Sequence, residues 1–229
     1  ELGCEVRTGV AQTGVIGLLS GGKPGPTVMV RVDMDALPIR EISDAPYVSQ
    51  VPGVMHACGH DGHVAVGLGA ATLLARHAAE LPGQVLLLFQ PAEEGLGGAR
   101  AVIADRALED PTPAAAFGLH LWNTMPLGRV AAQAGPLMAA ADVLRIVIRG
   151  KGGHGALPHE AVDAIAVTGQ VLSALQTIVS RNVDPQETAV LTIGTVHGGS
   201  KYNVIAETVE MQGTIRTFSA TVRETVVTR

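Results

Sequence analysis

The chain has 229 residues, of which 47% are hydrophobic and only 16% are charged. This composition supports the core of one large or two modest domains and excludes an intrinsically disordered protein. The net charge of −5 argues against nucleic acids and anionic membranes as partners, and no apolar run is long enough for a membrane span.

Two cysteines, Cys4 and Cys58, are too few for a disulfide framework. That count fits a reducing compartment and predicts a cytoplasmic protein. The chain opens without an initiator methionine and ends where a helix is expected to begin. We therefore expect it to be a fragment of a longer protein.

The first predicted elements are strands that lead to a pair of acids. Residues 5–7 and 13–19 have the pattern of short strands, and residues 21–26 have turn composition. Residues 27–32 form a continuous apolar run, which predicts a strand buried in a parallel sheet. Asp33 and Asp35 follow it, at the end of a strand where ligand sites of α/β sheets gather. Either acid could instead cap a turn.

Residues 55–63, with the sequence MHACGHDGH, concentrate three histidines, one cysteine and one acid. Cys58 and His60 are two positions apart, so their side chains share one face of an extended segment. Thiolate, imidazole and carboxylate are the usual ligands of a borderline-soft ion such as zinc. The alternative is a polar loop that opens a helix, with Cys58 as a small buried hydrophobe. The density of the cluster favours the metal site.

Further candidate ligands follow the next predicted strands. A helix is predicted for residues 64–79, a buried strand for residues 84–89 and a further apolar strand for residues 114–119. Glu93 and Glu94 come after the first of these strands, and His120 after the second. A single histidine is more often a satisfied core residue, but its position at a strand end favours a ligand.

The pattern changes near Ala139. Residues 142–149, 187–196 and 207–217 alternate apolar and polar side chains, as half-exposed antiparallel strands do. Residues 150–155 are predicted to be a flexible loop and residues 161–179 an amphipathic helix. We therefore predict a smaller α+β domain in residues 139–229, beside a metal-binding domain in residues 1–138. Its edge strands could serve dimerisation.

The first domain offers more ligands than one tetrahedral ion with an open position can use. Such a set suits two ions that share a bridging water, polarise an amide carbonyl and lower the pKa of the water. A carboxylate that is not a ligand would then carry the proton. The candidates are Asp33, Asp35, Cys58, His60, Glu93, Glu94 and His120.

Four motifs resemble those of the aminoacylase-like metallopeptidases, and in particular the hippurate hydrolases and the plant indole-acetyl-amino-acid amidohydrolases. The resemblance covers nearly the whole chain. It implies an α/β, phosphorylase/hydrolase-like catalytic domain, present in part, with an inserted smaller α+β dimerisation (lid) domain. The motifs are DMDALP at 33–38, MHACGHD at 55–61, QPAEEG at 90–95 and GHGALPH at 153–159.

The resemblance also implies roles at the metal site. Cys58, His60, Glu94 and His120 would bind the metal. Glu93 would be the general base and then the acid that protonates the leaving amine.

For the remaining residues, the resemblance implies supporting roles. Asp35 would be a supporting acid near the metal site, whereas the role of Asp33 stays open, because other branches carry a ligand histidine there. His154 would reach the substrate or the developing oxyanion across a dimer interface. Asn203 and Arg216 would help to hold the substrate carboxylate, although Arg216 could also be a surface strand residue.

We therefore predict a metal-dependent amidohydrolase that cleaves an N-acyl amino acid, hippurate-like or acetyl-amino-acid-like, to a carboxylic acid and an amino acid. Its expected cofactors are two divalent ions (zinc, manganese, cobalt or nickel) per full-length subunit, and its expected assembly is a homodimer through the lid. The family's further ligand histidine follows the lid, so this chain could lack a complete site. The alternatives are a dipeptidase or biosynthetic N-acyl deacetylase of the same family, and a non-catalytic metal-binding or dimerisation protein.

Overall fold

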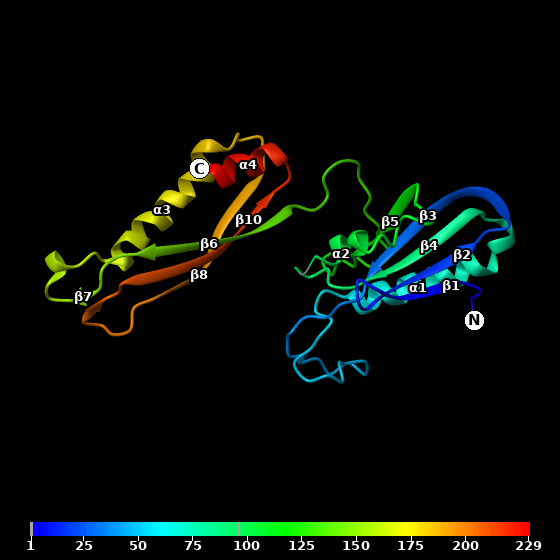
Figure 1. The fold of residues 1–229 in the computed structure, drawn as a ribbon, viewed down its shortest axis with the longest axis horizontal. Coiled ribbons are helices and arrows are strands. Elements are labelled where there is room, and N and C mark those ends of the chain that lie inside the picture. Colours follow the sequence, from blue (N-terminus) through cyan, green and yellow to red (C-terminus); the bar gives the residue numbers. More distant parts are fainter. Residues whose placement is uncertain (1, 96) are drawn as a thin grey trace. The chain divides into compact units, whose positions relative to one another are not determined.

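The computed structural model (Figure 1) describes residues 2–95 and 97–229. The chain divides into two compact units, residues 1–129 (unit 1) and Val130–Arg229 (unit 2). Each unit has its own main sheet. Within the described residues, no helix combines the length and the apolar character that a membrane crossing requires.

Unit 1 is built on a five-stranded mixed sheet with the order β1-β2-β4-β3-β5. β2 runs antiparallel to β1 and β4, whereas β3 runs parallel to β4 and β5. Asp33 at the end of β3 pairs with Gln90 at the end of β4, so the acids that follow both strands meet at one edge. The strands are β1 (Glu5–Val10), β2 (Gly14–Ser20), β3 (Lys23–Asp33), β4 (Pro82–Gln90) and β5 (Ala115–Gly118).

The strand β4 is the centre of the core of unit 1, because its side chains are buried on both faces. Leu86 and Leu88 pack with Val102 of α2 (Gly98–Ala104). Val85 and Leu87, which alternate with them, pack on the other face with residues of α1 (His60–Arg76). Fully burying each such side chain stabilises the fold by about 1.5–3 kcal/mol. The predicted α/β layers are therefore present, and a short 3₁₀ helix, η1 (Ala78–Glu80), follows α1.

The helix α1 begins at His60, four residues before the predicted start. Gly59 has a φ of 85°, in the left-handed region that glycine adopts without penalty, and its N–H donates to the carbonyl of His56. This turn lets the helix begin directly at His60. His60 and His63 are consequently neighbours on the first turn, and both are buried against the sheet.

Unit 2 is the predicted α+β fold. Its three antiparallel strands have the order β6-β10-β8, and two helices cover one face. Ile178 of the first helix and Val226 of the second join Leu191 and Ile215 of the sheet in one core. The side chain of Asp163 caps the first helix by accepting from two backbone N–H groups. The elements are β6 (Ala140–Arg149), α3 (Ala164–Asn182), β8 (Ala189–Gly198), β10 (Thr208–Thr217) and α4 (Ala220–Thr228).

Two sequence predictions were wrong in detail. Residues 23–26, predicted as a turn, belong to β3, which has a register shift between Lys23 and Thr27. Residues 150–155, predicted as a flexible loop, contain the short strand β7 (Gly153–His154), which pairs with β9 (Val204–Ile205). A 3₁₀ helix, η2 (Pro158–Glu160), follows β7.

Candidate metal centre

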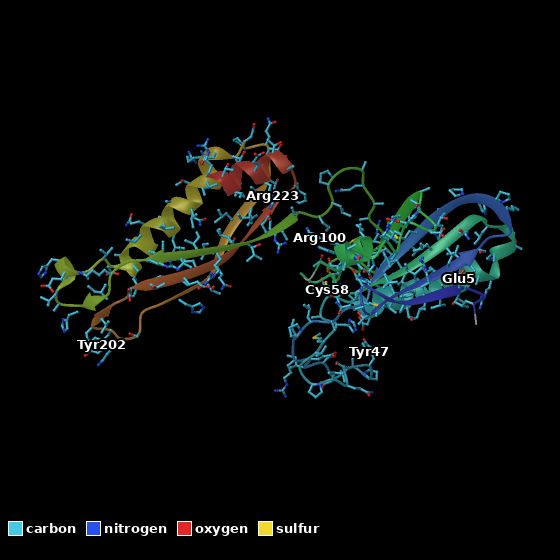
Figure 2. The ribbon with its side chains drawn as sticks, in the orientation of Figure 1. Glu5, Tyr47, Cys58, Arg100, Tyr202 and Arg223 are labelled. Carbon is cyan, nitrogen blue, oxygen red and sulfur yellow. The ribbon has the colours of Figure 1, made fainter. Side chains whose placement is uncertain are left out.

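The strand ends of unit 1 and the start of α1 bring most of the predicted site residues together. His60 belongs to three groups whose potential ligand atoms lie within 4.8 Å of one another. The first adds Cys58, labelled in Figure 2, and His120, the second adds Glu93 and Glu94, and the third adds Asp33 and His63. The five predicted ligand or base residues of this unit therefore gather around His60.

His60 is set up as a ligand. Its side chain is 1% exposed, and its Nδ1 lies 2.9 Å from the backbone carbonyl of Asp35, which can only accept. The proton therefore sits on Nδ1, and Nε2 keeps a free lone pair. This Nε2 is buried without a hydrogen-bond partner among the described residues and lies 3.8 Å from Glu94 Oε1. A histidine held through one nitrogen with the other free is the usual arrangement of a metal ligand.

Asp35 supports this arrangement rather than facing solvent. Its Oδ2 accepts from the backbone N–H of Glu94 at 3.0 Å, and its Oδ1 lies 3.3 Å from Nδ1 of His60. Burial alone would raise the pKa of Asp35, but the N–H groups of Glu94 and Glu93 outweigh it and lower that pKa. Ala92, with a φ of 55°, turns the chain just before these two amides. Asp35 is therefore an anion that fixes both His60 and the loop of the glutamates.

Cys58 and His120 form the second part of the centre. Sγ of Cys58 lies 3.4 Å from Nε2 of His120, whose Nδ1 lies 2.6 Å from the carbonyl of Leu121. Two ligands of a tetrahedral zinc ion, one sulfur and one nitrogen, lie about 3.5 Å apart. Burial and then Glu94 raise the pKa of the Cys58 thiol to about 11 in the absence of a cation. A divalent cation reverses this effect, because it binds the thiolate. The donor set therefore fits the predicted cofactor.

Asp33 and His63 lie beside the centre, and their geometry differs from that of ligands. Asp33 is 2% exposed, pairs with Arg31 at 2.7 Å and lies 2.5 Å from Nδ1 of His63. This contact is a hydrogen bond, so Nδ1 of His63 carries a proton and has no lone pair for an ion. Burial alone would raise the pKa of Asp33. The hydrogen bond from His63 and the charge of Arg31 outweigh burial, so the pKa is lowered overall. His63 was not among the predicted site residues, although it stands three positions after His60 in the histidine-rich motif.

The structure places the remaining predicted residues in unit 2. His154 in β7 pairs with Val204, next to Asn203, whose Oδ1 is buried without a partner among the described residues. A cavity of about 630 Å³ opens beside His154. Arg216 lies near the other end of β10, eight residues from Thr208, which corresponds to roughly 26 Å along a strand.

Figure 2 shows the same separation within unit 2. Tyr202, the neighbour of Asn203, lies at the end that carries β7, whereas Arg223 lies on α4 at the opposite end. Arg223 pairs with Asp142, whose neighbour in the sheet, Ile215, precedes Arg216. The unit itself therefore brings His154 and Asn203 together but leaves Arg216 apart from them.

The profile of peptidase family M20/M25/M40 matches residues 29–226. The chain belongs to this family. The resemblance predicted from the four motifs is thus confirmed, and so is the α/β fold with a smaller α+β unit, because solved structures of similar sequence share it. One is a protein from methicillin-resistant Staphylococcus aureus, described as an aminohydrolase, with a TM-score of 0.90 and 39% identity over 99% of this chain and 60% of that one.

Another M20 structure connects the family to metal. It is the YXEP protein of Bacillus subtilis, described as a dinuclear metal-binding peptidase, with a TM-score of 0.78 and 40% identity. The match covers 98% of this chain and 57% of that one. A two-metal centre is therefore a property of a relative with the same fold.

Three curated relatives show the range of activities near this M20 chain. The N-acetyl-L-cysteine deacetylase of Bacillus subtilis is 48% identical over 100% of this chain and 55% of its own length. Thermostable carboxypeptidase 2 of Saccharolobus solfataricus is 46% identical over 97% and 57%. The IAA-amino acid hydrolase ILR1-like 2 of Arabidopsis thaliana is 45% identical over 95% and 49%. The chain thus spans about half the length of these relatives.

Proposed function

We propose that the protein containing this chain is a metal-dependent amidohydrolase that converts an N-acyl amino acid to a carboxylic acid and a free amino acid. The observation that carries the proposal is the buried Nε2 of His60, which lacks a partner among the described residues although a thiol and carboxylates surround it. Such an unsatisfied atom costs about 1–3 kcal/mol. A divalent cation at this point would remove that cost.

In this proposal, Cys58, His60, Glu94 and His120 hold the ions. The soft thiolate of Cys58 favours zinc, cobalt or nickel, whereas the carboxylates would also accept manganese. Two bound ions would polarise the amide carbonyl and acidify a water molecule. Asp35 keeps His60 in the tautomer that has its Nε2 lone pair free.

Glu93 is the proposed proton carrier. Its side chain is exposed, whereas that of Glu94 is half-buried and lies near Nε2 of His60. Glu93 would accept a proton from the attacking water and return it to the amine nitrogen as the amide bond breaks. One water is consumed, and its atoms are divided between the acid and the amine.

The names of two relatives support the substrate class, because an acetylated cysteine and an IAA conjugate are both acyl groups on an amino acid. Hippurate-like substrates, with an aromatic acyl group, belong to the same class. The carboxypeptidase relative favours a second candidate, in which the substrate is a short peptide.

The test uses the whole protein and the substitution Glu93→Gln, with Glu80→Gln in the exposed η1 as the matched control. N-acetyl amino acids, N-benzoyl amino acids and dipeptides are assayed for release of free amine, and metal content is measured beside them. We expect Glu93→Gln to keep its metal and to lose about 10²–10⁴-fold in turnover. Unchanged turnover would remove Glu93 from the mechanism. A metal-loaded protein that hydrolyses none of these substrates would favour the non-catalytic alternative.

We also propose that unit 2 is a lid that forms a homodimer and brings His154, Asn203 and Arg216 to the substrate. The outer edges of β6 and β8 support this proposal, because no strand among the described residues pairs with either of them. Mixed dimers of His154→Ala and Glu93→Gln subunits should recover part of the activity that each variant lacks. Confirmed mixed dimers without recovery would contradict a role for His154 across the interface.

A further inference from the structure

We infer that His63 is a positioning residue, which holds His120 in place as a metal ligand by fixing the backbone of Leu121. The inference rests on the proposed metal centre. His63 is completely buried, and both of its ring nitrogens have partners. It therefore acts on the centre through its neighbours.

One end of His63 is anchored in the sheet. Its Nδ1 donates to Oδ1 of Asp33 at 2.5 Å, and the other oxygen of Asp33 accepts from Nη1 of Arg31 at 2.7 Å. Nε of Arg31 in turn donates to Gln90 of the neighbouring strand at 2.9 Å. Because β3 and β4 both contribute, the position of the imidazole is fixed by two central strands.

The other end of His63 holds the segment after β5. The backbone N–H of Leu121 donates to Nε2 of His63 at 2.8 Å. This bond requires a lone pair on Nε2, which agrees with a proton on Nδ1 facing the carboxylate of Asp33. The side chain of Leu121 packs in the space left by Gly62, where an added Cβ would lie 2.4 Å from Cδ1 of Leu121. Leu121 therefore docks on the first turn of α1 with both its backbone and its side chain.

This docking determines where His120 points. β5 ends at Gly118, and residues 119–121 belong to no strand and are exposed. The ring of His120 nevertheless lies edge-on to His63, with centroids 4.8 Å apart, and its Nδ1 lies 2.6 Å from the carbonyl of Leu121. Its Nε2 is thereby presented to Cys58. Without the bond from Leu121 to His63, an exposed segment would have to hold a ligand by itself.

The test measures cobalt binding to the whole protein through the charge-transfer absorption of a thiolate bound to Co²⁺, which reports the ion at Cys58 independently of activity. His63→Phe keeps a ring but removes both hydrogen bonds. We expect the cobalt affinity of this site to fall about 10–100-fold, as it does when a partner of a ligand histidine is lost. Val102→Ala is the matched control, because it destabilises the core on the α2 side of the sheet without touching the centre.

Two further variants separate the ends of His63. His63→Asn keeps a donor near Asp33 but loses the acceptor for Leu121, and we expect it to weaken cobalt binding at least tenfold. His63→Gln places an acceptor near Leu121, and we expect it to recover part of the affinity relative to His63→Asn. If His63→Phe does not fold, the comparison of His63→Asn with His63→Gln tests the inference.

Several results would overturn the inference. An unchanged cobalt affinity in folded His63→Phe or His63→Asn would make His63 a core residue only. An equal loss in Val102→Ala would assign the effect to overall stability. If the unsubstituted protein gives no thiolate–cobalt absorption, the proposed metal centre itself is wrong, and the inference falls with it.

Discussion

Two glycines of α1 allow the contact between this helix and the sheet to be measured. Gly67 is buried, and an added Cβ would lie 2.9 Å from Cγ1 of Val32 and 3.2 Å from its Cγ2. Val32 is 3% exposed, and its branched side chain has little rotational freedom, so it cannot turn away. Gly69, two residues later, is exposed, and an added Cβ would meet nothing within 4 Å.

Gly69→Ala should therefore stabilise unit 1, whereas Gly67→Ala should leave its stability unchanged or lower it. Each gains about 1 kcal/mol from the helix propensity of alanine. Gly67→Ala also overpacks the core, which costs about 1–3 kcal/mol. The propensity gain cancels when the two variants are compared. We expect Gly67→Ala to have the lower free energy of unfolding by about 1–3 kcal/mol, which is the overpacking cost alone.

The chain contains a single tryptophan, Trp122, which lies in unit 1. Urea unfolding followed by tryptophan fluorescence therefore reports unit 1 separately from unit 2. Equal free energies of unfolding in the two variants would refute the close contact between Gly67 and Val32. If the added methyl group of Gly67→Ala displaces α1, metal binding should also weaken, because His60 and His63 lie on the same helix.

Three further predictions concern charge and metal. The Cys58 thiol, with a pKa of about 11, must lose its proton to bind metal. Its deprotonation should therefore raise metal affinity by up to about tenfold for each pH unit. Calorimetry in buffers of different ionisation enthalpy should show that Cys58→Ala releases one proton fewer on binding metal. The pKa of Asp33 is lowered by folding, so its contribution to stability is present above its unfolded value, near 3.8, and is lost as the pH falls through the lower folded value. Asp33→Asn should therefore be less stable than the unsubstituted protein at pH 7, and the urea midpoints should converge below pH 4; parallel midpoints would contradict the lowered pKa. Zinc at 100 times its dissociation constant should stabilise unit 1 by about 2.7 kcal/mol in the fluorescence assay, and Cys58→Ala should abolish most of this gain.

The sequence allowed the central strands to be predicted, because residues buried on both faces of a sheet form continuous apolar runs. Leu86, Leu87 and Leu88 of β4 are such a run, and all are at most 3% exposed. The strand β7 was missed because the local sequence contains no such run. It consists of two residues, and its partner β9 lies about fifty residues later in the chain. Nothing local distinguishes such a strand from a glycine-rich loop.

The proximity of the candidate metal ligands was predictable, because the carboxyl ends of neighbouring parallel strands must meet at one edge. Cys58, His60, Glu94 and His120 do lie together, as that reasoning requires. The part played by His63 was not predictable in the same way. A helix starting at Val64 would have left His63 in a loop, and only the left-handed turn at Gly59 places it on the first turn of α1.

The two acids at the end of β3, Asp33 and Asp35, accept hydrogen bonds from different histidines. Asp35 fixes His60 through its backbone carbonyl, whereas Asp33 fixes His63 and, through it, the segment of His120. The charge of Asp33 is already balanced by Arg31, so it has little negative charge left to offer an ion. The two proposed histidine ligands are therefore held by different acidic residues, His60 by Asp35 directly and His120 by Asp33 through His63 and Leu121. We accordingly expect substitution of Asp35 to affect the ion at His60 first, and substitution of Asp33 to affect the ion shared by Cys58 and His120.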